Sequence, residues 1–302
     1  MTVLELVHRA SARLGDAGLC FGHGTTNALD EAAWLVLWRL GLPLDDLDGV
    51  AERSVAPAAQ LQVDALVAER IGSRRPAAYL TGEAWLQGVP FFVDERVIVP
   101  RSLIAEPLAE GLIDAWLGDA PPVRVLDLCT GNGSLAVLAA LAWPQAAVDA
   151  SELSADALAV AQRNVQRHGL AERITLRQGD GLAAARGRYD LILCNPPYVS
   201  RGSMAALPPE FRAEPALALD GGAHGSDDGM DFIRPLMHGV AGFLSPRGLL
   251  VLEIGHEKAH FDAAFARWPA VGLPCSAGDE QVLLFEAAGL AAATDRQTGR
   301  RA

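Results

Sequence analysis

The chain has 302 residues, half of them hydrophobic, and a formal net charge of −12. This length allows two domains, and the composition is typical of a globular protein. No apolar run approaches the roughly 20 residues of a membrane span. Strong negative charge disfavours a main task of binding phosphate backbones. We therefore expect no membrane partner and no direct sequence-specific nucleic-acid binding, whereas a basic protein partner stays compatible with the charge.

Cysteine usage and the N-terminus narrow the class of protein further. The four cysteines are scattered and form no CxxC pair, which argues against a structural zinc site. The first fifteen residues are amphipathic and lack the basic start and apolar centre of a secretory signal. We expect a cytoplasmic protein with reduced cysteines and no bound metal.

The sequence pattern changes twice in the first third of the chain. Residues 1–75 carry apolar residues at helical spacing, with Pro43 and Pro57 near the breaks, and predict a small helical domain. Residues 76–102 place aromatic and β-branched residues between glycines and predict a β-hairpin linker. Residues 103–118 then predict one apolar helix.

From Val123 onward, strand patterns alternate with helical patterns. Alternation of this kind indicates an α/β domain, here over residues 103–287, with a mainly parallel sheet covered by helices on both faces. Residues 199–229 predict a long irregular segment that helps to cover a site. Residues 288–302 show no periodicity and predict a disordered tail.

A glycine turn marks the first candidate site, in the stretch VLDLCTGNGSLAVLAA. A strand ends at Asp127 and Leu128, and Gly131 and Gly133 allow a tight turn before a helix begins. The free N–H groups of that helix N-terminus favour a nucleotide, although such turns also occur in ordinary βα units. No Gly-Lys-Ser/Thr follows, and Gly-x-Gly-x-x-Gly is incomplete at Ala136, so a nucleoside is favoured over a dinucleotide.

Acidic residues end the next two strands. Glu152 ends the second strand, where a carboxylate can accept hydrogen bonds from ribose hydroxyls; Asp149 is the alternative, but it lies inside the strand. Asp180 follows the third strand and can accept from an exocyclic amine such as that of adenine. Each could instead be a cap or turn residue. Three acidic strand ends suit an adenosine that carries an amino-acid tail, as in S-adenosylmethionine.

The fourth strand runs from LILC into Asn195-Pro196-Pro197-Tyr198. Proline lacks an N–H donor, so the strand must stop at Cys194, at the sheet edge where α/β proteins bind ligands. The Asn195 side-chain oxygen and the Pro196 carbonyl are uncharged acceptors that can fix both hydrogens of an NH₂ group. Tyr198 can pack against a flat amide or against its own loop.

Together, these motifs resemble the class I S-adenosylmethionine-dependent methyltransferases, which have a Rossmann-like, mainly parallel sheet. The stretch 78–101 and the helical domain before it narrow the resemblance to protein glutamine methyltransferases of the HemK/Prm type, over about residues 5–287. Val99-Pro100-Arg101-Ser102 and Leu128-Cys129-Thr130-Gly131 resemble the branch whose substrate is the third large-subunit ribosomal protein. In this family the helical domain would dock the protein substrate.

The resemblance implies a reaction and a set of residues. A methyl group would pass from S-adenosylmethionine to the side-chain amide nitrogen of a glutamine, leaving S-adenosylhomocysteine, with no metal. The catalytic residues would be Asn195, Pro196, Pro197 and Tyr198. The cofactor would be held by Asp127, Cys129, Thr130, Gly131, Asn132, Gly133, Glu152, Asp180, Asn195 and Arg101. Glu253 would support either the Asn-Pro-Pro-Tyr loop or the sulfonium side.

An amide nitrogen is a poor nucleophile because its lone pair is shared with the carbonyl. Two fixed acceptors would aim this lone pair at the methyl group and stabilise the positive charge that builds on nitrogen. No histidine is needed, and His23 is expected at the surface or at a helix cap. Three alternatives stay open: a release-factor glutamine methyltransferase, a DNA adenine amino-methyltransferase, and a non-catalytic ribosome-assembly protein.

Overall fold

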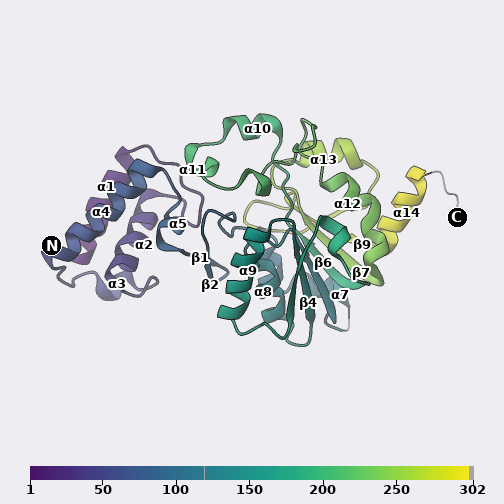
Figure 1. The fold of residues 1–302 in the computed structure, drawn as a ribbon, viewed down its shortest axis with the longest axis horizontal. Helices are drawn as coiled ribbons and strands as arrows, with labels where there is room; N and C mark the ends of the chain where they lie inside the picture. Colours follow the sequence, from purple (N-terminus) through teal and green to yellow (C-terminus); the bar gives the residue numbers. More distant parts are fainter. Residues whose placement is uncertain (119, 299–302) are drawn as a thin grey trace.

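The computed structural model describes residues 1–118 and 120–298, with a helical N-terminal part beside a larger α/β part (Figure 1). The N-terminal helices are α1 (Val3–Asp16), α2 (Ala28–Leu40), α3 (Leu47–Val50), α4 (Pro57–Ser73) and α5 (Ala77–Thr81). Thr2 and Glu5 form a capping box at α1, and Asn27 caps α2. Buried aliphatic side chains of these helices form a core of their own. None of the described helices is long and apolar enough to cross a bilayer.

A β-hairpin joins the two parts. Its strands β1 (Glu83–Leu86) and β2 (Val89–Phe92) are antiparallel and turn at Gln87 and Gly88, which both have positive φ. The Asn164 side chain of α9 (Ala155–Arg167) accepts from the Phe92 N–H at 2.7 Å and donates to the Phe92 carbonyl at 2.9 Å. The hairpin is thereby fixed to the α/β part.

Seven strands form the main sheet, in the order β5-β4-β3-β6-β7-β9-β8. The first five strands of this order are mutually parallel, β9 runs antiparallel to β7, and β8 runs antiparallel to β9. The strands are β3 (Arg124–Leu128), β4 (Ala147–Glu152), β5 (Ile174–Gln178), β6 (Tyr189–Cys194), β7 (Leu244–Glu253), β8 (Val271–Gly272) and β9 (Val282–Glu286). The predicted mainly parallel α/β fold is confirmed.

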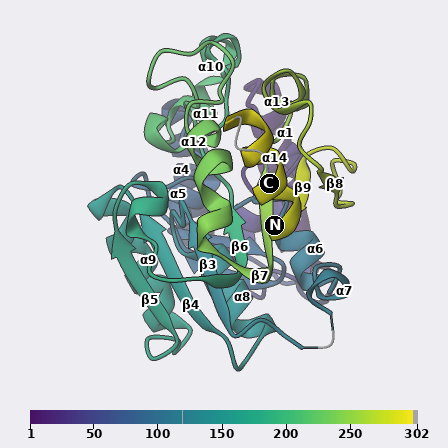
Figure 2. The same ribbon diagram turned by 90° about the vertical axis from the view of Figure 1, so that its right-hand side faces the viewer.

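Alternate residues of β3, β6, β7 and β9 enter two different cores, as the pleat requires. Val125 and Leu193 face one core, which includes α8 (Ser134–Ala142). Leu126 and Ile192 face the other, covered by α12 (Ile233–Gly239), η3 (Val240–Phe243), α13 (Lys258–Phe265) and α14 (Ala287–Thr298). Figure 2 shows α12 and α14 over this second face.

Two predictions of secondary structure are wrong. The tail predicted to be disordered over 288–302 is helical to Thr298, with Leu290 and Ala293 buried against the second core; residues 299–302 lie outside the described part. The sequence did not predict this helix, because its many alanines give almost no periodic hydrophobic pattern. The single helix predicted over 103–118 is two, α6 (Ala105–Ala109) and α7 (Asp114–Leu117), because Gly111 between them adopts φ +71°.

Candidate active site

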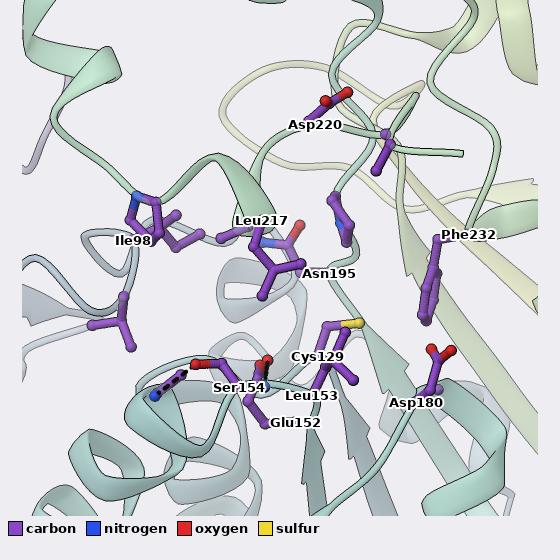
Figure 3. A pocket seen from close by; sticks show the side chains of 18 of the residues that line it. Ile98, Cys129, Glu152, Leu153, Ser154, Asp180, Asn195, Leu217, Asp220 and Phe232 are labelled. Atoms are coloured by element: carbon purple, nitrogen blue, oxygen red, sulfur yellow. Dashed lines mark hydrogen bonds between the residues drawn. The ribbon is translucent and has the colours of Figure 1, made fainter. Parts of the chain in front are cut away.

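The predicted acidic and amide residues meet at the carboxyl edge of the parallel strands. A cavity opens there, and Cys129, Glu152, Asp180 and Asn195 all line it (Figure 3). They lie at or just after the ends of β3, β4, β5 and β6, which point the same way, so residues far apart in sequence come together. Ile98 of the linker also lines this cavity, so the chain before the sheet closes one side of it.

The glycine turn passes through three left-handed residues, Cys129 (φ 59°), Gly131 (φ 56°) and Gly133 (φ 83°). A side chain at Gly133 would press on Ala161 of α9, so this position favours glycine both for its backbone and for its packing. The turn brings the start of α8 against α9 and presents Cys129 to the cavity.

Glu152 fastens the glycine turn to the end of β4. Its carboxylate accepts from the Gly131 N–H and from the Ser154 N–H, each at 3.0 Å. Asp149 lies inside β4, where it accepts from the Tyr189 hydroxyl at 2.7 Å and pairs with Arg124. Glu152, and not Asp149, is therefore the β4 carboxylate at the cavity.

Asp127 lies buried behind this turn. Its Oδ2 accepts from the Thr130 hydroxyl and from the Ala136 N–H, whereas its buried Oδ1 has no partner in the described part of the chain. Burial raises the pKa of Asp127 to about 7. The buried Nδ2 of Asn132 also lacks a partner there. Neither residue lines the cavity itself. An unused acceptor before the glycine turn and an unused donor within it suit the ammonium and carboxylate of an amino-acid group.

The other end of the cavity combines an acidic and an aromatic side chain. Asp180 is exposed, and its carboxylate makes no cap hydrogen bond to the 3₁₀ turn η1 (Gly181–Ala184). Phe232, just before α12, lies on the same side of the cavity as Asp180 in Figure 3. A flat ring and a carboxylate acceptor suit an aminopurine. No motif marked Phe232, because its place in the site depends on the long connection between β6 and α12.

Asn195 separates two cavities. A second cavity lies beyond it, and Pro196, Tyr198, Arg101 and Glu253 line that cavity. In the part of the chain that the structure describes, no hydrogen bond uses the Asn195 side chain or the Pro196 carbonyl. These two acceptors are therefore available to a group that enters from the second cavity toward the first.

Two contacts hold the hydroxyl end of the Tyr198 ring. Its hydroxyl donates to Oε1 of Glu253 at 3.0 Å, and its ring lies so close to Gly255 that a side chain there would clash. Oε2 of Glu253 accepts from the Ser102 hydroxyl at 2.6 Å and from the Leu103 N–H at 2.9 Å. Burial raises the pKa of both Glu253 and Tyr198. Glu253 was predicted to support either the Asn-Pro-Pro-Tyr loop or the sulfonium side. Its contacts are those of a residue that supports the loop.

Arg101 is not brought to the cofactor cavity, where it was predicted. Its guanidinium lies at the second cavity and donates to both carboxylate oxygens of Glu214, at 2.5 and 2.7 Å. Burial alone would raise the pKa of Glu214, but Arg101 and the neighbouring His23 lower it to about 2. His23, predicted at the surface or at a cap, is instead 2% exposed, with Nε2 3.4 Å from Glu214.

The segment predicted to be irregular over 199–229 contains short helical turns and covers the second cavity. These are α10 (Arg201–Ala206), α11 (Pro209–Arg212) and η2 (Ala216–Ala218). Val199 donates to the Leu219 carbonyl at 2.9 Å and accepts from the Gly221 N–H at 3.1 Å. Phe211 and Leu219 line the cavity. The two hydrogen bonds thus join the end of this segment to Val199, the residue that follows Tyr198.

Comparisons with known proteins agree with this geometry. The family model of the methyltransferase small domain matches residues 112–219, which include the glycine turn and the Asn-Pro-Pro-Tyr loop. The chain is 53% identical over 288 residues to a ribosomal protein uL3 glutamine methyltransferase of Bordetella pertussis, covering 94% of each chain. Proteins of the same name from Burkholderia pseudomallei and Neisseria gonorrhoeae are 50% and 45% identical, covering 96% and 94% of each chain respectively.

Proposed function

The chain belongs to the family of ribosomal protein uL3 glutamine methyltransferases, and from this premise we propose that it methylates the side-chain amide nitrogen of a glutamine in that ribosomal protein. The methyl donor is S-adenosylmethionine, and the reaction takes place in the cytoplasm, where ribosomes are assembled. The observation that carries the proposal is the position of Asn195 in the wall shared by two cavities, with its side-chain oxygen unused.

The first cavity and the glycine turn beside it fit the donor in three places. At the turn, Asp127 and Asn132 offer an unused buried acceptor and donor to the amino-acid group. Glu152 lies beside the glycine turn, where the ribose hydroxyls would bind, and Asp180 with Phe232 would hold the adenine. When bound, S-adenosylmethionine supplies a methyl group on a positively charged sulfur.

The second cavity admits the glutamine side chain. The Asn195 Oδ1 and the Pro196 carbonyl accept the two amide hydrogens, and the two prolines hold these acceptors in place. Accepting both hydrogens turns the nitrogen lone pair toward the first cavity and favours the positive charge that develops on nitrogen. Tyr198, fixed by Glu253 and Gly255, presents its ring to the plane of the amide.

No general base is needed before methyl transfer. The nitrogen becomes acidic only once it carries the methyl group, and its proton then leaves to water. The Glu253 carboxyl contacts the loop through Tyr198. It accepts three hydrogen bonds, from Tyr198, Ser102 and Leu103, and these bonds hold the loop.

The test is mass spectrometry of candidate substrates after incubation with the enzyme and S-adenosylmethionine. Ribosomal protein uL3 and a release factor are offered separately, each beside a copy in which the target glutamine is changed to glutamate. We expect one added methyl group on the ribosomal protein and none on its glutamate copy. Methylation of the release factor alone would keep the chemistry and overturn the proposed substrate.

A further inference from the structure

A groove on the N-terminal part takes no part in the site described above. It runs between α2 with the turn that follows it, on one side, and β1 on the other; Figure 1 shows α2 and α3 on one side of β1. Three tryptophans line it, Trp34 and Trp38 of α2 and Trp85 of β1. Trp85 is 45% exposed because it alternates with the buried Ala84 along β1.

The groove is also acidic. Asp30, Trp34 and Trp38 follow one another at intervals of four residues and so share one face of α2. Asp45 lies in the turn after α2, and Glu83 lies beside Trp85. Within the described part of the chain no lysine or arginine lines the groove or pairs with Asp30 or Asp45, whereas Glu83 pairs with Arg167 at 2.7 Å.

We propose that this groove docks a lysine- or arginine-bearing segment of the ribosomal protein substrate. This inference rests on the proposed function. Cationic side chains bind well over tryptophan faces, and carboxylates at the rim add charge attraction. A protein that binds ribosomal RNA carries such side chains in order to neutralise phosphates, so its surface is basic while it is free of RNA. Nucleic acid itself is a poor occupant, because the rim would repel its phosphates.

The last described helix is also a poor occupant. α14 lies at the opposite end of the molecule from α2 in Figure 1. A separate, basic protein therefore fits the groove better than α14. Docking here would hold the substrate by a second contact, outside the cavity that receives the glutamine.

The experiment compares two substrates with the same target glutamine: the full-length ribosomal protein and a short peptide around the glutamine. The variants are Trp85→Ala and the pair Asp30→Asn with Asp45→Asn. We expect each variant to raise KM for the full-length protein about fivefold or more, with kcat and the KM of the peptide unchanged. The acidic pair variant should also lose much of the salt dependence of kcat/KM.

Trp116→Ala on α7 and Asp16→Asn on α1 are the matched controls, because each removes an exposed tryptophan or aspartate outside the groove. Circular dichroism and S-adenosylhomocysteine binding check that every variant is folded. Full-length KM values equal to wild type in both groove variants would overturn the docking proposal alone. A wild-type enzyme that leaves the ribosomal protein unmethylated would instead overturn the proposed function, and the docking site with it.

Discussion

The Tyr198 hydroxyl donates a hydrogen bond to the Glu253 carboxyl at 3.0 Å, and this bond joins the loop after β6 to the end of β7. The same carboxyl also accepts from Ser102 and Leu103, so one buried group holds three segments of the chain. The tyrosine is therefore positioned by the protein before any substrate arrives. Such preorganisation lowers the cost of orienting the amide at the moment of reaction.

Replacing Tyr198 by phenylalanine tests this positioning. The ring stays, but the buried Glu253 carboxyl loses one of its donors, which costs about 1–3 kcal/mol of unfolding free energy. We expect kcat to fall several-fold while S-adenosylhomocysteine binds as in wild type. Urea unfolding and steady-state kinetics measure the two effects. An unchanged kcat in a stable variant would show that the hydroxyl does not position the ring for catalysis.

Gly255 gives an independent test of the same ring. A methyl group at this position would clash with Tyr198, and the residue adopts φ +51°. Gly255→Ala should therefore lower kcat more than Tyr198→Phe, because it displaces the whole ring. Gly225→Ala, at an exposed position with positive φ and open space around it, is the matched control for backbone strain. Equal effects of the two alanines on kcat would argue against a role of the ring.

Binding of S-adenosylhomocysteine should depend on pH through Asp127. The pKa of this carboxyl is raised to about 7, so its charged form, which attracts an ammonium group, increases as pH rises through 7. Affinity should fall as pH decreases from 7.5 to 6, with proton release on binding near pH 7. Calorimetry in two buffers measures both. In Asp127→Asn both effects should vanish; a flat pH profile in wild type would contradict this role of the carboxyl.

The Glu214 carboxylate should stabilise the fold only above acidic pH. Its pKa is lowered from the usual 4.5 to about 2, so its contribution is complete above pH 4.5 and is lost as pH falls toward 2. Glu214→Gln should cost about 3 kcal/mol at pH 7. The difference in unfolding free energy between this variant and wild type should shrink between pH 5 and pH 3. Urea unfolding at each pH measures it. A difference that does not change with pH would mean that packing, and not charge, is lost.

Much of the candidate site could be predicted from the sequence because it depends on strand ends. Glu152, Asp180 and Asn195 each lie at the end of a recognisable strand, and parallel strands bring their carboxyl ends to one edge. Arg101 could not be placed, because its partner Glu214 lies 113 residues away, in a segment without periodicity. The same limit applies to Phe232, and the alanine-rich α14 has no hydrophobic period from which to predict a helix.

The most direct test of the central claim is a single-turnover measurement on Asn195→Ala with saturating donor and ribosomal protein uL3. If the Asn195 oxygen holds the amide in the transition state, the rate of methyl transfer should fall about 10²- to 10³-fold. Binding of S-adenosylhomocysteine should stay within about twofold of wild type, because Asp127, Glu152 and Asp180 remain in place. A rate near that of wild type, with the donor still bound, would contradict the account.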